Sequence, residues 1–313
     1  MKIFNHKIKL IVMLMGMLLI LSACSGYRNL NVSEDGDTRM LLTDDAREVE
    51  VPTVPERVVL IRAVDIGNSL LLDANVVGVS DVVEGSFIEE EVIDSGITLI
   101  EHGDLETIES LDPDLIVTYK HDTYYSNYED IATTIEINAT PPLFMTPYRA
   151  RQYLDHMYYI SVILNQEEEG REYAEGLLND HTVIRRDLNF DASAHSAIVI
   201  SEADDMYYAH AEYNGYGTEV VYDILGFEIT RDVRSLVNNP QEFESDLTPY
   251  RDYEFDYAFV FVEGDDYDEA EMAEQLDIDE SKLIVGSTEE FRLNDLISIR
   301  HQADYLIDAL NNK

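Results

Sequence analysis

The chain has 313 residues, with 21 Lys and Arg against 64 Asp and Glu, which gives a formal net charge of −43 at pH 7. Binding to nucleic acid takes clustered basic side chains, and the chain has no basic stretch after its ninth residue, so the composition argues against a nucleic-acid partner. Hydrophobic residues make up 45% of the chain, including 20 Tyr and 10 Phe, which excludes a disordered acidic chain. The length fits one large domain or two lobes of about 100 to 150 residues each.

The first residues predict export. Residues 1–9 contain three lysines and no acid, and residues 10–21 form an apolar run broken only by Gly16. This is typical of a signal peptide, and the run is shorter than the roughly 20 residues that span a membrane. The stretch Leu21-Ser22-Ala23-Cys24 resembles the lipobox of bacterial lipoproteins. We therefore predict a signal peptide over 1–23 and lipid attachment at Cys24, with an uncleaved signal anchor as the alternative.

Removal of the signal peptide leaves 18 basic residues against 64 acids, a net charge of −46. The single cysteine excludes an intrachain disulfide and a cysteine-based zinc cluster. Residues 24–43 are mostly polar, apart from the short cluster Met40-Leu41-Leu42. We predict that this segment is a flexible, lipid-anchored tether.

Residues 44–165 are predicted to form an N-terminal α/β lobe. Short β-branched and apolar runs predict strands, and the stretches between them predict helices. The strands are expected at 58–61, 76–79, 115–118 and 143–145, and the helices at 65–73, 105–111 and 128–135. Alternation of this kind favours a mainly parallel sheet covered on both faces.

A long helical region follows. Thr146 and Pro147 offer an N-cap and a first-turn proline for a helix over 148–164. A second helix begins near 166 with three glutamates and ends near 188 with Arg185 and Arg186, which suits the helix dipole. We predict a rigid connecting helix over 166–190.

Residues 191–313 are predicted to form a C-terminal α/β lobe. Strands are expected at 197–201, 257–262 and 283–285, and helices at 217–225, 269–276 and 300–310. The expected architecture is α/β, with two lobes that have mainly parallel central sheets, one long rigid helix between them, and a ligand cleft between the lobes.

Four segments resemble one protein family. Residues 43–59 (T-D-D-A-R-E-V-E-V-P-T-V-P-E-R-V-V) are similar to a D-x-x-G-R-x-V-x-V-P segment that leads into a first strand, with Ala46 where glycine usually stands. Residues 103–117, 215–227 and 294–298 match later segments in the same order. Together they resemble the siderophore and cobalamin group of solute-binding lipoproteins of ABC importers, the class with a helical backbone, and most of all the Gram-positive hydroxamate-siderophore binders.

This resemblance implies a function and partners. The chain is expected to capture a ferric siderophore outside the cell and deliver it to an ABC permease and its ATPase for iron uptake. It is expected to be a monomer, lipid-anchored through Cys24 on the extracellular face of a Gram-positive membrane. The siderophore is a transported ligand, so no cofactor and no resident metal are expected.

In the family, a glutamate on each lobe docks on arginines of the permease. Glu106 occupies the matching position in the first lobe, and Glu244 is the expected second member, with Asp246 as its neighbour. Two acidic groups that pair with arginine on two lobes would set the register of the complex. In so acidic a chain, the alternative for either residue is an ordinary solvated carboxylate.

Ligand contacts are expected from cations and aromatic residues near the ends of predicted strands, because open α/β sheets bind ligands beyond the carboxyl ends of their strands. Tyr, His and Arg side chains suit the apolar rims and oxygen-rich iron centres of ferric siderophores. The candidates are Arg62, Tyr119, His121, Tyr207, Tyr208, His210, Tyr213, Tyr216 and Arg292.

Charge favours one ligand class. A net charge of −46 and few arginines disfavour anionic catecholate or citrate complexes, and a neutral or cationic hydroxamate avoids the repulsion. Haem or cobalamin binding within the same family is an alternative, although the chain has no Trp for a cobalamin cleft.

Two alternatives come from other classes. A lipid-anchored hydrolase would need a catalytic motif, and the sequence contains no G-x-S-x-G, no H-E-x-x-H and no P-loop, so we expect no enzymatic activity. A purely structural surface lipoprotein would not need the segment that resembles a permease-docking site.

Overall fold

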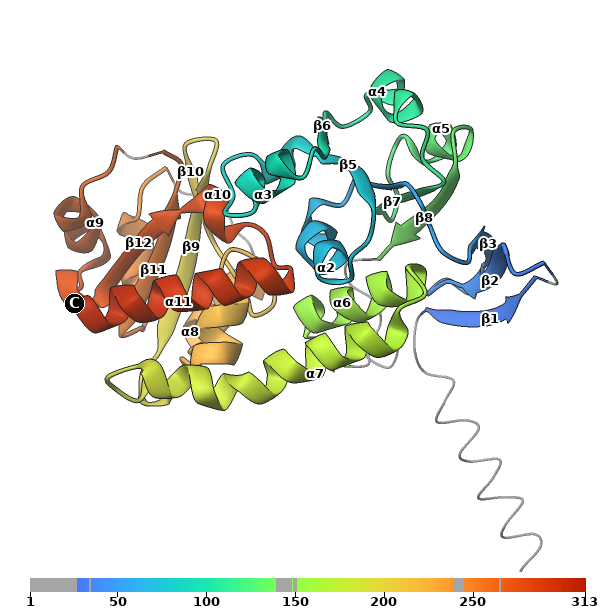
Figure 1. The fold of residues 1–313 in the computed structure, drawn as a ribbon. Helices are drawn as coiled ribbons and strands as arrows, with labels where there is room; N and C mark the ends of the chain where they lie inside the picture. The colour runs from blue at the N-terminus through green and yellow to red at the C-terminus, as the bar shows by residue number, and fades with distance from the viewer. Residues whose placement is uncertain (1–26, 34, 139–147, 149–150, 239–244, 265) are drawn as a thin grey trace, which may run out of the picture.

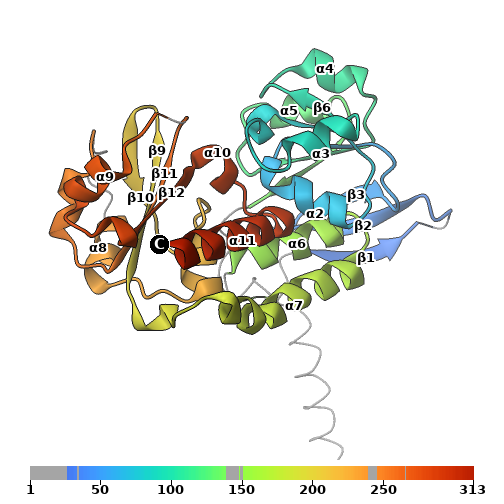
Figure 2. The same cartoon turned by 60° about the vertical axis from the view of Figure 1, so that its left-hand side comes forward.

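The computed structural model describes residues 27–33, 35–138, 148, 151–238, 245–264 and 266–313. Two α/β lobes lie side by side above a pair of long helices, as Figures 1 and 2 show. The predicted strand at 143–145 and the N-cap at Thr146 and Pro147 lie outside the described residues, as do Cys24 and Glu244. No helix of the described part is long and apolar enough to cross a membrane.

The N-terminal lobe is built on a five-stranded sheet in the order β6-β5-β4-β7-β8. Every neighbouring pair is parallel. The strands are β4 (Val58–Leu60), β5 (Val76–Ser80), β6 (Thr98–Ile100), β7 (Leu115–Tyr119) and β8 (Thr133–Ile137). The predicted parallel sheet is confirmed, and three of its strands match predicted ranges.

Alternating side chains divide the core of this lobe between the two faces of the sheet. Val59 and Ile116 pack against α4 (Leu105–Ser110) and α5 (Tyr125–Glu129) on one face. Val58 and Leu115 belong to the main core, which includes side chains of α2 (Ile66–Leu71), α3 (Glu89–Asp94) and α6 (Gln152–Ile163). Successive strand residues point to opposite faces, so continuous apolar runs require cover on both.

The second lobe has a four-stranded sheet in the order β10-β9-β11-β12. The strands are β9 (Ala197–Ala203), β10 (Met206–Ala209), β11 (Tyr257–Val262) and β12 (Leu283–Ser287). β9, β11 and β12 are parallel, and β10 is antiparallel at the edge. The helices of this lobe are η6 (Glu219–Leu225), α8 (Arg231–Asn238), η7 (Thr248–Asp252), α9 (Glu269–Leu276), η8 (Glu280–Lys282), α10 (Thr288–Phe291) and α11 (Leu296–Asn312).

The connection between the lobes is helical, as predicted. α6 (Gln152–Ile163) is followed by α7 (Glu167–Ile184) and by the short helices η4 (Arg185–Asp187) and η5 (Ala192–Ala194). α7 runs below both lobes in Figures 1 and 2. α6 and α7 approach closely where Gly170 faces Ser161, since a Cβ on Gly170 would lie 2.2 Å from the Ser161 Cβ. The fold class predicted from the sequence is confirmed.

The predicted helix over 128–135 is wrong. The chain forms the short helix α5 (Tyr125–Glu129) and then the edge strand β8 (Thr133–Ile137). Thr134, Ile135 and Ile137 are all buried. β-branched residues fit a pleated surface covered by a helix, so packing against β7 outweighs the helical reading of this segment.

The predicted flexible tether over 24–43 is wrong from Tyr27 onward. β1 (Arg28–Val32), β2 (Thr38–Leu42) and β3 (Glu48–Pro52) form an antiparallel sheet, here called the N-terminal sheet. Tyr27 and Leu41 are fully buried. The cluster around Leu41, read from the sequence as an isolated apolar patch, packs in the main core. Two short helices complete the described elements, η1 (Ala63–Asp65) and η2 (Asp81–Val83).

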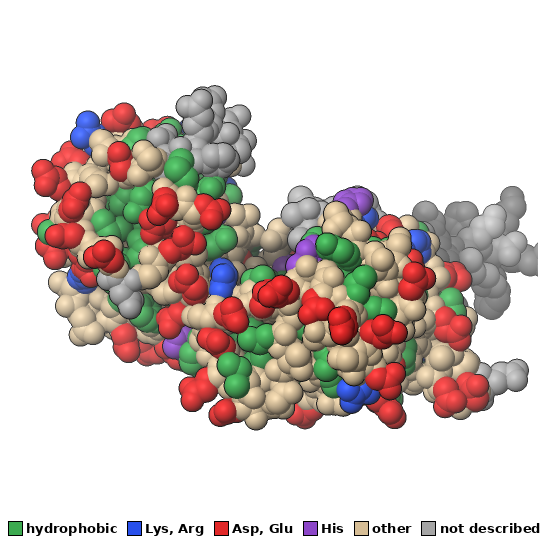
Figure 3. All heavy atoms as spheres, turned by 90° about the horizontal axis from the view of Figure 1, so that it is seen from above, with side chains coloured by type: hydrophobic (Ala, Val, Ile, Leu, Met, Phe, Trp, Pro, Cys, Tyr) green, Lys and Arg blue, Asp and Glu red, His purple; other side chains and the backbone are tan. Residues whose placement is uncertain are grey.

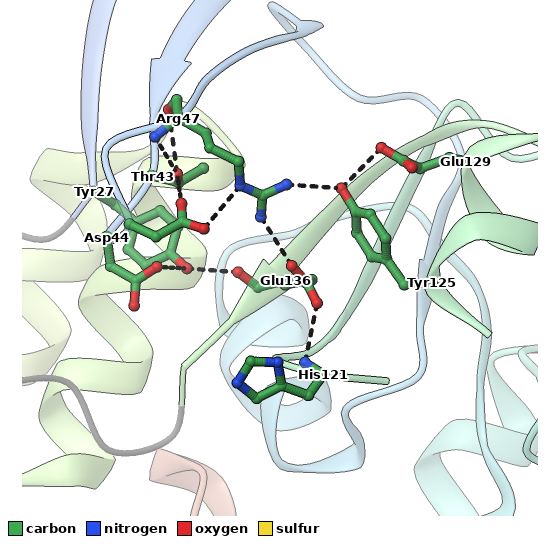
Figure 4. Close-up of polar contacts among 9 residues, drawn as sticks. Tyr27, Thr43, Asp44, Arg47, His121, Tyr125, Glu129 and Glu136 are labelled. Carbon is green, nitrogen blue, oxygen red and sulfur yellow. Dashed lines mark hydrogen bonds and ion pairs between the residues drawn. The ribbon is translucent and has the colours of Figure 1, made fainter. Parts of the chain in front are cut away.

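Arg47 joins the N-terminal sheet to the first lobe (Figure 4). Its guanidinium donates to Asp45 at 2.8 Å, to Glu136 on β8 at 2.9 Å and to the Tyr125 hydroxyl at 3.1 Å. These charge-assisted bonds come from three separate segments, so they hold the turn between β2 and β3 against the edge of the lobe. Burial lowers the pKa of Arg47, but the hydrogen bonds to Tyr125 and Asp45 together outweigh it and raise the pKa above its ordinary value.

Candidate ligand cleft

The carboxyl ends of the five parallel strands lie along one edge of the first sheet, because the strands all run in the same direction. Arg62 follows β4, His102 follows β6, and Tyr119 ends β7. Seen from above, the surface is indented between the two lobes (Figure 3). The predicted residues from the first lobe therefore stand at the edge where open α/β sheets bind ligands.

Arg62 is buried at the base of this edge, with 5% of its surface exposed. Its Nε donates to Asp65 at 2.8 Å, and its Nη2 has no hydrogen-bond partner among the described residues. Burial raises the pKa of Asp65, and the nearby guanidinium opposes that rise. Burial and the charge of Arg62 lower the pKa of His156 on α6, so this histidine is neutral. The base of the cleft thus carries little net charge.

Tyr119 belongs to a polar cluster that the sequence analysis did not identify. Its hydroxyl lies 2.8 Å from His102 Nε2, which also lies 3.2 Å from Asp122. Asp122 in turn accepts a hydrogen bond from the Thr118 hydroxyl and is buried. His102 could have been found from the sequence by the same rule, had 98–100 been read as a strand.

His121 stands apart from this cluster. Its side chain is exposed, and its backbone takes a φ of 69°, in the left-handed region. The backbone N–H donates to Glu136 at 3.0 Å, as Figure 4 shows. Tyr119 and His121 are thus both at the end of β7, but with different surroundings.

Tyr207 and Tyr208 lie on opposite faces of the second sheet. β10 pairs with β9 so that Tyr207 is opposite Glu202 and Tyr208 is opposite Ser201. Directly opposed residues share a face, and neighbours along a strand do not. The two tyrosines therefore have different surroundings, and contact of either with a ligand stays a prediction. Burial, followed by the Glu202 carboxylate, raises the pKa of Tyr207 to about 12.

His210 is held by protein partners at both ring nitrogens. The Asn214 amide donates to Nδ1 at 2.9 Å, so the proton of the neutral ring sits on Nε2 and donates to the Ser201 hydroxyl at 2.7 Å. Burial lowers the pKa of His210 to about 4, which keeps the ring neutral. The ring stacks on Tyr216 with centroids 4.5 Å apart. His210 can contact a ligand through its ring but is not free to ligate iron.

Tyr213 and Tyr216 come from a tight loop after β10. Both have a left-handed backbone, with φ of 59° and 52°. Burial, followed by the Asp223 carboxylate, raises the pKa of Tyr213 to about 12. Asp223 also forms an ion pair with Arg151 at 2.8 Å, just before α6. The loop thus lies near the start of the helical connection.

Arg292 contacts the other lobe. Its Nη2 donates to the carbonyl oxygen of Glu84, which follows η2 in the first lobe. Nearby, Phe87 of the first lobe stacks on His301 of α11 with centroids 3.6 Å apart. Arg292 therefore bridges the lobes at one side of the cleft.

The lobes also meet through a buried polar seam, defined here as Asn68, Glu219, Asn294 and Asp295. Asn294 donates to Glu219 at 3.1 Å, and Asn68 accepts from the backbone N–H of Leu296 at 3.0 Å. Asp295 caps α11 through the N–H groups of Ile297 and Ser298, and burial raises its pKa to about 6. No local sequence pattern marks this seam, because Asn68 meets a segment 228 residues further along the chain and Glu219 meets Asn294 across 75 residues.

Glu106 lies in the first turn of α4 and is exposed. Asp104 caps this helix by accepting from the Thr107 N–H at 3.1 Å. Glu106 and Glu109 are both exposed on the same short helix, whose other face packs on the sheet through the buried Ile108. Within the described residues, no group of three or more His, Cys, Asp and Glu side chains could hold a metal ion.

No protein-family model matches the chain, and no curated protein matches it significantly. Several solved structures, however, match the chain in fold. The FhuD protein from S. pseudintermedius is 20% identical with a TM-score of 0.72, and the match covers 91% of this chain and 99% of that one. FhuD2 from Staphylococcus aureus with bound ferrioxamine B is 20% identical with a TM-score of 0.68, covering 82% of this chain and 99% of that one.

A third structure comes from Bacillus subtilis and is described as a periplasmic binding protein component of a Fep/Fec-like ferrichrome ABC transporter, of the FhuD fold family. It is 17% identical with a TM-score of 0.67, and the match covers 86% of this chain and 99% of that one. The chain therefore has the fold of these binding proteins over nearly their whole length, as the sequence motifs predicted.

Proposed function

We propose that this protein is an extracytoplasmic solute-binding lipoprotein that captures a ferric siderophore and delivers it to an ABC permease. It acts as a binding protein rather than an enzyme. The fold, shared with a protein that holds ferrioxamine B, and the aromatic and polar residues at the strand ends support this proposal. A lipid at Cys24 holds it on the outer face of the membrane, where it works as a monomer.

One observation favours the hydroxamate class. Of the two arginines expected in the cleft, Arg62 already pairs its charge with Asp65 and Arg292 donates to the Glu84 carbonyl, which leaves one guanidinium nitrogen of each without a partner among the described residues. A catecholate or citrate complex carries negative charge and needs free cations to offset the field of an acidic protein. A neutral or cationic ferric hydroxamate needs none and can use tyrosine rings and hydroxyl groups. Haem and cobalamin are the alternatives within the same fold.

The ligand is identified by titration. The chain contains no Trp, so its intrinsic fluorescence comes from tyrosine and is quenched by an iron chromophore bound near the tyrosines of the cleft. Ferrioxamine B, ferrichrome, a ferric catecholate, haem and cobalamin are titrated separately. We expect the two hydroxamates to saturate the quenching at the lowest concentrations. Saturation by haem or cobalamin alone would contradict the siderophore assignment.

Substitutions in α4 test whether Glu106 docks on the permease. Glu106→Gln keeps the shape of the side chain and removes the charge that pairs with a permease arginine, so we expect uptake of ferrioxamine B iron to fall about tenfold or more with unchanged binding. Glu109→Gln is the matched control, one helical turn away and equally exposed. Equal uptake by the two variants would show that Glu106 has no docking role. Glu244 is the proposed partner position on the second lobe.

A further inference from the structure

The N-terminal sheet restricts how far the body can move from its lipid anchor. Tyr27 is fully buried, its hydroxyl donates to the Glu136 carbonyl oxygen at 2.6 Å, and its ring lies 5.0 Å from that of Tyr159 on α6. Tyr27 is the third residue after Cys24. A chain spans at most about 3.6 Å per residue, so Tyr27 lies within about 11 Å of the lipidated residue. The inference below rests on the proposed lipoprotein function.

This distance conflicts with docking through α4. Ile108 of α4 packs on one face of the first sheet, whereas Tyr27 belongs to the core on the other face, with α6. Figures 1 and 2, which share a vertical axis, show α4 at the top and β1 and α7 well below it. A helix layer and a sheet layer are each about 10 Å thick, so at least about 20 Å separate Tyr27 from the outer surface of α4.

With Tyr27 in place, the protein cannot turn α4 toward a permease in the same membrane and keep Cys24 in the lipid. The chain would have to reach at least about 20 Å past the lobe, and further still to the edge of the permease, with about 11 Å available. Either docking uses another face, or the segment after Cys24 leaves the body.

Tyr27 and Leu41 hold the segment on the body, but the contacts of Arg39 favour the second possibility. Arg39 of β2 is 1% exposed and donates to the Ile163 carbonyl and to Asn29, with no carboxylate partner in the part of the chain that the structure describes. Two hydrogen bonds replace only part of the hydration that a buried guanidinium without a counter-charge loses, and burial lowers the pKa of Arg39 to about 10. The Arg39 guanidinium is hydrated again when β2 detaches from the body, and the detached residues regain conformational entropy.

We propose that residues 27–42, here called the strap, detach from the body to let the protein dock on its permease. With the strap bound, the body is held close to the anchor with α4 turned away from the membrane. With the strap detached, the first residue held on the body is Thr43, which comes nineteen positions after Cys24, so the tether reaches at most about 68 Å. Arg47, Glu136 and Tyr125 remain joined and keep β3 on the body.

A crosslink tests the strap. Asn29 of β1 contacts Asn165, which lies between α6 and α7, with Nδ2 and Oδ1 3.3 Å apart. Cys24 is lipidated, so Asn29→Cys and Asn165→Cys supply the two free thiols for a short bis-maleimide. We expect crosslinking to lower uptake of iron from ferrioxamine B by tenfold or more without changing ferrioxamine B binding. The uncrosslinked double variant is the control.

A second change distinguishes two reasons why crosslinking could lower uptake: the tether is too short, or the crosslink has damaged the protein. Insertion of about twenty Gly and Ser residues after Gly26 lengthens the tether without releasing the strap, so it restores uptake by the crosslinked protein. Crosslinked protein that delivers iron at the uncrosslinked rate overturns the proposal, and so does a crosslinked protein that the linker fails to rescue.

A measurement without ligand or permease separates this proposal from the proposed function. The lipidated protein is placed in phosphatidylcholine vesicles with a donor dye on Glu109→Cys of α4 and an acceptor dye at the bilayer surface. We expect energy transfer to increase when the strap is weakened by Leu41→Ala, which removes a fully buried side chain of β2 from the main core, and not to increase in the crosslinked protein. Equal transfer in all variants contradicts the strap, whereas failure to bind any siderophore contradicts only the proposed function.

Discussion

Ala46 occupies a backbone position that favours glycine. Its φ is 64°, it is exposed, and its N–H donates to the Thr43 carbonyl at 3.1 Å in the turn between β2 and β3. The sequence motif has glycine here in similar proteins, and the left-handed conformation supplies the reason, since a Cβ makes it costly.

Ala46→Gly should therefore stabilise the protein, against the usual effect of glycine. We expect the free energy of unfolding to rise by about 0.5 to 1 kcal/mol, the relief of strain exceeding the added entropy of the unfolded chain. Urea denaturation measures it. Ala270→Gly, at an exposed position in the first turn of α9, is the control and should destabilise. A loss of stability in both variants would contradict the strain at Ala46.

Asp155 in α6 makes stability depend on pH. It is 1% exposed, one carboxylate oxygen accepts from the Tyr148 N–H at 2.9 Å, and the other has no partner among the described residues. Burial raises its pKa to about 7. The folded state therefore binds a proton more tightly than the unfolded state, whose carboxyl has an ordinary pKa near 4, and stability falls as the pH rises from about 4 to 7.

Asp155→Asn removes this dependence while keeping an oxygen for the Tyr148 N–H. We expect the variant to exceed the natural protein in free energy of unfolding by roughly 1 to 3 kcal/mol at pH 8, with the difference shrinking toward zero near pH 4. Denaturant titrations at the two pH values measure it. Asp304→Asn, exposed on α11, is the control. A difference that does not change with pH would show that the carboxyl is not the cause.

At the scale of elements, α7 carries two glycines with opposite roles. Gly170 faces α6, and a Cβ there would lie 2.2 Å from the Ser161 Cβ. Gly176 has nothing within 4 Å of its added Cβ. The first glycine permits close packing of the connecting helices, and the second only weakens the helix.

Gly170→Ala should lower the free energy of unfolding by about 1 to 3 kcal/mol, because α6 and α7 must separate. Gly176→Ala should raise it by about 0.5 to 1 kcal/mol, the difference in helix propensity. Thermal unfolding of both variants under one condition gives the comparison. Two changes of the same sign would mean that the close approach does not limit the packing.

Elements differed in how well the sequence predicted them. β11 and α9 agree with their predicted ranges residue for residue, because apolar runs and the Asp268 cap mark their limits. β6 was not predicted, and β8 was read as helix, because their short β-branched segments are defined by pairing with a neighbouring strand. The N-terminal sheet was missed because the apolar residues of β1 and β3 are separated by polar residues, and the apolar run of β2 is only three residues long.

At the scale of the whole molecule, the excess of acid opposes folding. Sixty-four carboxylates against 21 basic residues repel one another, and acidic side chains cover much of the face seen in Figure 3. The Debye length falls from about 30 Å at 0.01 M salt to about 3 Å at 1 M, so salt removes most of this repulsion.

We therefore expect the melting temperature to rise by several degrees or more between about 0.01 and 1 M NaCl. KCl should act equally, since screening depends on ionic strength and not on the cation. Calorimetry without ligand measures the change. A melting temperature that falls with salt would mean that favourable ion pairs, such as those of Arg47, outweigh the overall repulsion.

The sequence by itself determined the α/β class, the two lobes with their helical connection, and the segments that resemble siderophore-binding proteins. These follow from local patterns: apolar runs, capping residues, and motifs near strand ends. Arg62 and Tyr119 could be predicted as candidates because each follows or ends an identifiable strand, and Arg292 because it precedes a segment that resembles the family.

Only the tertiary structure decided which candidates act together. Strand pairing placed Tyr207 and Tyr208 on opposite faces, burial and two hydrogen bonds engaged both nitrogens of His210, and lobe contact tied Arg292 to Glu84. The tertiary structure also showed that much of the expected tether, from Tyr27 onward, belongs to a sheet that packs on the body. Each of these outcomes depends on contacts between residues far apart in the chain, which no local pattern records.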